Sequence, residues 1–314
     1  MLHSASPAAA LVLVVLAEAG TGGRVQRLPS STPGPESRGT ATSAGQTAAP
    51  QHVSVADLEV AYRVLGQGEP LLLITGLGAT MDLWDPVLLA ELAAHYTVIL
   101  FDNRGMGGTT APPGEFSIEQ LADDTAGLMH ALGFEQAHVL GYSMGGYVAQ
   151  ELVLKYPQRV TRLVLLGSGC GGTEGIPPRP EVLRALTDLS GSIAEVLQRV
   201  ISVLVPADWS HRHGAYLERI LTRPPQPPSQ ESLARQQRAM DNWQGTYERL
   251  PQVSQPTLVL SGTLDQVLVP ANAILLVNRI PGAWLAQFQG GGHGMQYQYP
   301  KHIAATIRTF LEAP

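Results

Sequence analysis

The sequence has few of the residues from which disulfides, metal sites and nucleic-acid surfaces are built. It contains one cysteine, Cys170, so neither an intrachain disulfide nor a Cys-x-x-Cys motif can form. Its 20 basic and 26 acidic residues give a formal net charge of −6, without a basic block or an acidic tail. We therefore expect no nucleic acid among its partners. One free thiol fits a reducing or an oxidising compartment and leaves the role of Cys170 open.

A hydrophobic run long enough to span a bilayer is also missing near the N-terminus. The apolar stretch over residues 8–17 is too short, and Ala17-Glu18-Ala19 directly after it is an A-x-A pattern. Together these features are typical of a secretory signal peptide over residues 1–19, although no Lys or Arg precedes the run. The alternative is an extension on a cytosolic enzyme. We expect no stable membrane insertion, and a location that is extracytoplasmic with a signal and cytoplasmic without one.

Residues 20–50 are rich in Gly, Ser, Thr, Ala and Pro and contain no aromatic residue. Such a segment buries too little apolar surface to offset the entropy lost on ordering. The sequence therefore predicts a disordered low-complexity linker over residues 20–50, followed by a single domain over residues 51–314. At 44% hydrophobic and 15% charged, the chain has an ordinary globular composition.

Short apolar runs recur through this domain and are separated by helix-length segments. Several runs are continuous in Leu, Val and Ile, which is typical of parallel strands covered on both faces. Their order implies right-handed crossovers and an α/β sheet. The expected strands are EVAYRVLG (59–66), PLLLITGLG (70–78), YTVILFDNRG (96–105), AHVLGYS (137–143), TRLVLLGS (161–168), PTLVLSGTLD (256–265) and AWLAQFQGGGHG (283–294).

Helical patterns lie between these runs. Ser117 followed by Gln120 predicts an N-terminal capping box, and Gly133 suits the end of that helix. The strand–helix alternation stops between residues 171 and 250, which we interpret as a helical cap inserted over the strand ends. Aromatic residues of this insertion are candidates for a pocket wall, although in helices they more often belong to the core. They are Trp209, Tyr216, Trp243 and Tyr247.

Residues 141–145 read G-x-S-x-G, with Ser143 between an apolar strand and an amphipathic helix. The chain has 33 glycines, so the pattern alone could arise by chance. The strand before it and the helix after it make a nucleophile elbow the better interpretation. A serine hydroxyl is a weak nucleophile, and it needs a base to accept its proton and donors to stabilise the oxyanion. We therefore predict that Ser143 is a catalytic nucleophile.

Two residues further along the chain have the right positions to activate Ser143. Asp265 ends one expected strand, and His293 lies in GGGHG after the last one, in the order acid then histidine. His293 would accept the serine proton, and Asp265 would hold the imidazole tautomer and stabilise its cation. Each could alone be an ordinary loop residue, but their joint placement favours catalysis. The competing histidines lack this loop position: His130, His138, His211, His213 and His302.

The oxyanion hole requires two backbone N–H groups. Met144 directly follows the serine and supplies one of them. The second is expected from the loop TGLGAT, where we assign Leu77, with Gly78 as the neighbouring alternative. Attack by an activated serine needs no metal or organic cofactor. The His211-x-His213 pair also lacks a carboxylate cluster that would favour a metal site.

Taken together, the motifs resemble the α/β-hydrolase superfamily, in the group with a helical cap between the sixth and seventh strands. The matching elements are TGLGA (75–79), FDNRGMGGT (101–109), GYSMGG (141–146), GTLDQVLVP (262–270) and GGGHG (290–294). The resemblance implies a mostly parallel eight-stranded sheet with helices on both faces. Relatives often carry His where this chain has Thr75, and the resemblance makes Asp102 a structural residue.

This resemblance implies a carboxylic ester hydrolase acting on a small-molecule ester or lactone through an acyl-enzyme on Ser143. A lactonase similar to 3-oxoadipate enol-lactonase, or a C–C bond hydrolase, remains an alternative, because both share the motifs. Haloalkane dehalogenation and epoxide hydrolysis are disfavoured, since such relatives carry Asp at the nucleophile position. A binding protein without catalysis is the third interpretation, because a fold alone does not determine function. The natural substrate, its acyl chain and the oligomeric state are left open.

Overall fold

The computed structural model describes residues 49–188, 190–222 and 229–314. The predicted signal peptide and nearly all of the predicted linker lie outside these residues. Among the helices of the described part, none is both long enough and apolar enough to cross a membrane.

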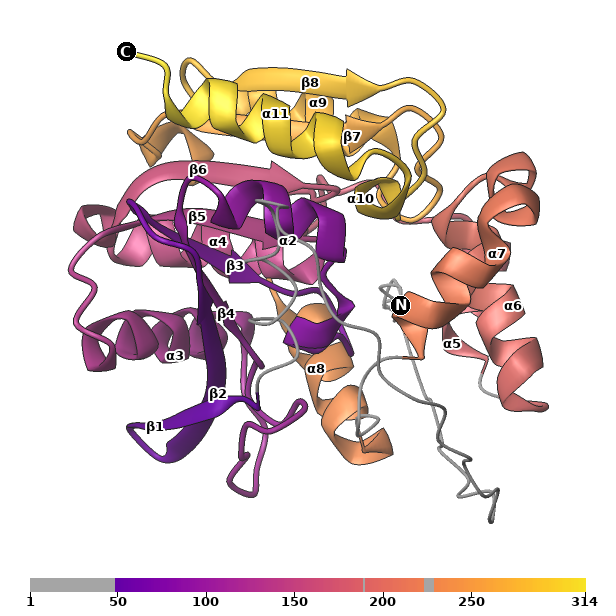
Figure 1. Ribbon diagram of the computed structural model, residues 1–314, viewed down its shortest axis with the longest axis horizontal. Coiled ribbons are helices and arrows are strands. Elements are labelled where there is room, and N and C mark those ends of the chain that lie inside the picture. The colour runs from indigo at the N-terminus through magenta and orange to yellow at the C-terminus, as the bar shows by residue number, and fades with distance from the viewer. Residues whose placement is uncertain (1–48, 189, 223–228) are drawn as a thin grey trace, which may run out of the picture.

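A single eight-stranded sheet organises the domain, in the order β1-β2-β4-β3-β5-β6-β7-β8 (Figure 1). Strand β2 is antiparallel to both of its neighbours, and all the pairs from β4 to β8 are parallel. The mostly parallel α/β sheet is thereby confirmed. The strands are β1 (Gln51–Val55), β2 (Leu58–Leu65), β3 (Pro70–Ile74), β4 (Thr97–Phe101), β5 (Ala137–Tyr142), β6 (Val160–Leu166), β7 (Thr257–Gly262) and β8 (Trp284–Phe288).

The strands end earlier than several of the apolar runs that predicted them. The run over 70–78 gives β3 only to Ile74, and the run over 283–294 gives β8 only to Phe288. The remaining residues of both runs form loops at the carboxyl edge of the sheet. Strand β1 was not predicted individually, because its residues are mostly exposed and lack a hydrophobic run. It pairs with β2 as an edge hairpin.

Helices cover both faces of the sheet. Apolar residues of α3 (Ile118–Ala131), α4 (Met144–Lys155) and α9 (Pro270–Arg279) pack in one core cluster, whereas α2 (Pro86–Ala93) and α11 (Pro300–Leu311) pack in the other. Ser117 caps α3 by accepting from the Gln120 N–H at 3.2 Å, as predicted. The Gln120 side chain bonds to Asp124 rather than back to the cap, so only half of the predicted box forms.

Four helices lie between β6 and β7. They are α5 (Pro180–Thr187), α6 (Ile193–Leu204), α7 (Ala207–Leu221) and α8 (Gln230–Asn242). We call residues 171–250 the insertion. Helices α5, α6 and α7 lie on the side toward which the arrows of β6 and β8 point (Figure 1). Short helical turns complete the chain: η1 (Met81–Leu83), η2 (Pro157–Arg159), η3 (Leu250–Gln252) and α10 (Met295–Gln298).

The insertion has two parts that pack differently. Helices α5 to α7 share a small hydrophobic cluster, which also includes Leu83 and Val267. Helix α8 instead joins the core cluster that contains α3, α4 and α9, through Leu233 and Ala239. A hydrogen bond from the Tyr216 hydroxyl to the buried Asp85 carboxylate ties α7 to the start of α2. The insertion therefore contacts the sheet domain at several separate places.

Candidate active site

Ser143 lies in the tight turn between β5 and α4. Its φ of 55° and ψ of −122° are a strained conformation for a residue with a side chain. The neighbouring strand holds this turn, because the Ser143 N–H donates to Leu166 O at 3.0 Å and Ser168 Oγ donates to Ser143 O at 3.0 Å. The strained backbone is thus fixed from both sides.

The glycines around Ser143 are required because the backbone passes so close to its neighbours. A Cβ at Gly141 would lie 2.3 Å from Gly145 O, and one at Gly145 would lie 2.2 Å from Ile74 O. One at Gly146 would lie 2.2 Å from Ser168 Oγ. Each distance is far below van der Waals contact. The glycine-rich sequence therefore allows helix α4 to begin directly against β3, β5 and the loop after β6.

The structure brings together the three residues predicted to act as a unit. His293 Nε2 lies 3.0 Å from Ser143 Oγ, and His293 Nδ1 lies 2.9 Å from Asp265 Oδ2. Both distances are within hydrogen-bond range. The other carboxylate oxygen of Asp265 accepts from the N–H groups of Val267 and Leu268, at 2.8 and 2.9 Å. These bonds leave Asp265 with one oxygen directed at the imidazole.

His293 is completely buried, so its orientation is set by its neighbours. The Tyr142 ring lies 5.2 Å from the imidazole, centroid to centroid, and the Tyr142 hydroxyl donates to His293 O at 3.2 Å. Burial raises the pKa of the Tyr142 phenol well above its usual value, which keeps it a neutral donor. The sequence-based prediction missed Tyr142, although it directly precedes Ser143.

The loop after β3 passes beside Ser143. A Cβ at Gly76 would lie 3.1 Å from Ser143 Cβ. Within the described part of the chain, the N–H groups of Leu77 and Met144 have no protein acceptor, whereas the Gly78 N–H donates to Gln236 Oε1 at 2.9 Å. Of the two alternatives for the second donor, Leu77 is therefore the one whose N–H remains available.

Thr75 and Asp102 have structural contacts. Asn103 Nδ2 donates to both Thr75 O and Thr75 Oγ1, at 3.3 and 3.2 Å, which holds the start of the loop. The Asp102 carboxylate accepts from the N–H groups of Met81 and Gly108, at 2.8 and 2.9 Å. Burial raises the pKa of Asp102 to about 6, against the effect of these two bonds. Asp102 thus joins two loops and has no contact with His293.

Two of the competing histidines, His138 and His213, have other partners. His138 bonds to Glu69 and Thr161 at the start of β5, the end of the strand opposite Ser143. Burial lowers the pKa of His138. His213 stacks on Trp209, with ring centroids 4.3 Å apart. In the residues that the structure describes, no group of three His, Cys, Asp or Glu side chains could hold a metal ion.

A cavity of about 330 Å³ opens next to Ser143. This volume is at the lower end of the range for small-molecule sites. Of the four aromatic residues considered for a pocket wall, only Trp243 is part of the lining. The lining residues are Ser143, Tyr147, Gly169, Gly171, Gly172, Thr173, Gly175, Ile176, Pro177, Pro178, Met240, Asp241, Trp243, Gln244, Val267, Leu268 and Asn272.

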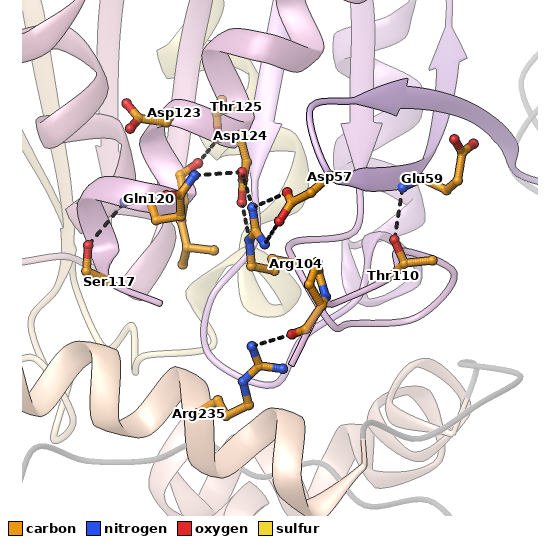
Figure 2. A network of polar contacts seen from close by, with 12 residues as sticks. Asp57, Glu59, Arg104, Thr110, Ser117, Gln120, Asp123, Asp124, Thr125 and Arg235 are labelled. Carbon is orange, nitrogen blue, oxygen red and sulfur yellow. Dashed lines mark hydrogen bonds and ion pairs between the residues drawn. The ribbon is translucent and has the colours of Figure 1, made fainter. Parts of the chain in front are cut away.

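An ion-pair network around the buried Arg104 fixes the loop that follows β4, and the sequence analysis did not predict this network. The Arg104 guanidinium makes two bonds of 2.7 Å to Asp124, on α3, and two more to Asp57, at 3.0 and 3.3 Å (Figure 2). These carboxylates raise the pKa of Arg104. Figure 2 also shows Arg235, from α8, reaching the backbone of this loop. Its partner is Pro112 O, at 2.8 Å.

Comparison with known proteins identifies the family of this chain. Residues 69–300 match the model of the family described as the alpha/beta hydrolase fold. The chain belongs to the α/β-hydrolase family. The family and the names of its relatives indicate a hydrolase. A similar curated protein is the putative carbamate hydrolase RutD of Pantoea ananatis, 33% identical over 261 residues, which are 80% of this chain and 92% of that protein.

Two solved structures have a similar fold. The enol-lactonase from Burkholderia xenovorans LB400 is 26% identical, with a TM-score of 0.73 over 84% of this chain and 100% of that one. The meta-cleavage product hydrolase CumD from Pseudomonas fluorescens IP01 is 26% identical, with a TM-score of 0.74 over 84% of this chain and 97% of that one. The shared fold therefore spans proteins named for different hydrolytic reactions.

Proposed function

We propose that the protein is a serine hydrolase that cleaves an ester or a related acyl bond of a small molecule. The observation that carries this proposal is the hydrogen-bonded chain from Ser143 through His293 to Asp265 at the cavity wall. A nucleophile, a base and an orienting carboxylate in this order are the arrangement that activates a serine hydroxyl. No step needs a metal or an organic cofactor.

The first half-reaction forms the acyl-enzyme. Ser143 Oγ attacks the carbonyl carbon of the substrate while its proton passes to His293 Nε2. The Leu77 and Met144 N–H groups donate to the oxyanion, and the N-terminus of α4 adds a favourable partial positive charge. The bond to the leaving group then breaks, and the leaving group takes the proton from His293.

The second half-reaction releases the acid. Water gives a proton to His293 Nε2 and attacks the acyl carbon through the same oxyanion site. Collapse of this intermediate breaks the bond to Ser143 Oγ, which recovers its proton from His293. Asp265 stabilises the imidazolium in both halves, and its bonds to the N–H groups of Val267 and Leu268 keep it oriented.

Two other hydrolytic functions use the same machinery. The similarity to an enol-lactonase and to a meta-cleavage product hydrolase favours a lactonase or a C–C bond hydrolase as the second candidate. In a lactone the leaving group stays attached to the acyl chain, and in C–C cleavage it is a carbanion equivalent. A panel of esters of increasing acyl length, lactones and vinylogous diketones would rank the three functions by kcat/KM.

The catalytic role of Ser143 is tested directly with a fluorophosphonate probe. We expect covalent labelling of the wild-type protein at Ser143 and none of the Ser143→Ala variant. Ser261→Ala is a matched control that should be labelled like the wild type, because Ser261 is another buried serine, in β7. A folded wild-type protein that stays unlabelled would instead support a binding protein on a hydrolase scaffold.

A further inference from the structure

Two polar side chains that line the cavity, those of Trp243 and Asn272, are hydrogen-bonded within the protein. Trp243 Nε1 donates to Glu151 Oε1 at 2.7 Å, and the indole stacks on Tyr147 with ring centroids 4.5 Å apart. Both polar atoms of the Asn272 amide are hydrogen-bonded: its Oδ1 accepts from Ile176 N and its Nδ2 donates to Ile176 O, each at 2.9 Å. Hydrogen bonds within the protein therefore satisfy the polar groups of both side chains.

Positive charge is missing from the same wall. Among the described residues that line the cavity, none is Lys, Arg or His, whereas Asp241 contributes a carboxylate. Two cations outside the lining are each paired with a carboxylate: Arg179 with Glu181 at 3.4 Å, and Arg249 with Glu151 at 2.8 Å. A second carboxylate, Glu174, lies beside the lining residue Gly172. The described lining thus carries one carboxylate and no cation.

We infer that this cavity selects uncharged acyl donors and discriminates against substrates that carry a carboxylate, with Asp241 as a specificity-determining residue. A buried anion needs a compensating cation, and none of the described lining residues supplies one. The inference rests on the proposed function and refines it. Esters and lactones whose acyl chain ends in a carboxylate should then be poor substrates. Enol-lactones of dicarboxylic acids belong to this group, so the inference argues against the enol-lactonase alternative.

Two esters of similar size test the inference. 4-Nitrophenyl heptanoate and the mono-4-nitrophenyl ester of adipic acid differ mainly in a terminal carboxylate. After normalisation to their rates with hydroxide, we expect kcat/KM to favour the heptanoate by about tenfold or more. Asp241→Asn should raise kcat/KM for the adipate ester severalfold more than kcat/KM for the heptanoate. Glu231→Gln, an exposed charge removal on the same helix, should change neither.

A binding measurement separates this inference from the proposed chemistry. In the Ser143→Ala variant, heptan-2-one should raise the melting temperature more than 6-oxoheptanoate does. Equal stabilisation, or equal turnover of the two esters, would overturn the inference while fluorophosphonate labelling left the serine mechanism intact. An unlabelled protein that still prefers the neutral ketone would refute the mechanism and retain the inference.

A second feature lies on α8, where this helix meets the loop after β3. Gln236 is completely buried, and its Oε1 accepts the Gly78 N–H at 2.9 Å. Its Nε2 has no partner within the described residues. Arg235 anchors the helix by donating to Pro112 O and lying over the Phe116 ring, 5.0 Å from its centroid. A glutamine with an unpaired donor is a stability cost that an apolar residue would avoid.

The geometry points to Gln236 as a positioning residue. Through Gly78 it holds the loop after β3, which carries the Leu77 N–H proposed for the oxyanion hole. Gly78 has a φ of 66°, and its peptide directly follows Leu77, so the bond to Gln236 restricts the turn that presents the Leu77 N–H. This role also rests on the proposed function. It would affect the stabilisation of the transition state rather than the binding of the substrate.

Gln236→Leu and Gln236→Glu test this role. We expect the leucine variant to lose about tenfold or more in kcat with KM within about twofold, and to react more slowly with a fluorophosphonate. The glutamate variant keeps an acceptor for Gly78 and should recover most of the rate. Gln230→Leu, at the exposed start of α8, is the control for the change in composition. Unchanged kcat in a folded leucine variant, or equal losses in both variants, would overturn the role.

Discussion

The turn that carries Ser143 and the insertion that faces it are held in different ways. Backbone packing fixes the turn, because glycines at 141, 145 and 146 leave no room for a side chain. Side-chain bonds hold the insertion: Trp243 to Glu151, Arg235 to Pro112 and Tyr216 to Asp85. The proposed chemistry thus depends on packing that tolerates almost no change, whereas the proposed specificity depends on contacts that substitution can alter one at a time.

The largest expected effect is on turnover, at the three residues that act as a unit. Ser143→Ala and His293→Ala should each lower kcat by about 10⁴-fold or more, and Asp265→Asn by a similar order, because each breaks one linked step. Far-ultraviolet circular dichroism should show an unchanged fold. A purified Ser143→Ala protein with near-normal turnover would reject the mechanism.

A methyl group in the elbow should cost more stability than one in the insertion. Gly145→Ala places a Cβ 2.2 Å from Ile74 O, so we expect a loss of about 4 kcal/mol or failure to fold. Gly214→Ala, next to the kink at His213 in α7, has no atom within 4 Å of the new Cβ and should change the unfolding free energy by about 0.5 kcal/mol or less. Urea unfolding measures the unfolding free energy of both variants. Similar losses in the two would contradict the contrast between the elbow and the insertion.

The buried carboxyl group of Asp102 should make the unfolding free energy depend on pH. Its folded pKa of about 6 lies above the ordinary aspartate pKa of 3.8, so between these pH values the native state holds more protons than the unfolded chain. This contribution to the unfolding free energy is greatest below pH 4 and is lost as pH rises to 6, by up to about 3 kcal/mol. The difference in unfolding free energy between wild type and Asp102→Asn should fall across this window.

Asp57 provides a control of opposite sign. Hydrogen bonding to Arg104 lowers the pKa of Asp57, so its contribution is present above the unfolded pKa and is lost as pH falls. The difference between wild type and Asp57→Asn should therefore decrease toward acid pH. The same slope for both variants would contradict the assignment of burial as the dominant cause at Asp102.

The smallest expected effect is a change in acyl-chain preference. Trp243→Ala opens space beside the cavity and should shift the ratio of long-ester to short-ester kcat/KM severalfold toward the long ester. The rate of labelling by a small fluorophosphonate should change less than this ratio. Trp209→Ala is the matched control, because Trp209 does not line the cavity. An unchanged ratio across a set of insertion variants would place specificity in the core loops.

The local order of strand, turn and helix could be predicted because it depends on neighbouring residues. The run before Ser143 and the stripe after it appear as β5 and α4, and Ser117 caps α3. Strand ends were less predictable, since an apolar run such as 283–294 continues into a buried loop. Strand β1 carried only a weak hydrophobic signal, because Val53 and Val55 are its only apolar residues and just one of them, Val55, is buried.

The sequence by itself determined which residues could react: a serine in a glycine turn, then an acid, then a histidine, each placed by the strand before it. Only the tertiary structure decided that Gln236 occupies the Gly78 N–H, that Trp243 lines the cavity and Trp209 does not, and that the lining lacks a cation. The physical reason is distance along the chain. Motifs follow from local backbone geometry, whereas Gln236 and Gly78 lie 158 residues apart and meet only because α8 packs against the sheet domain.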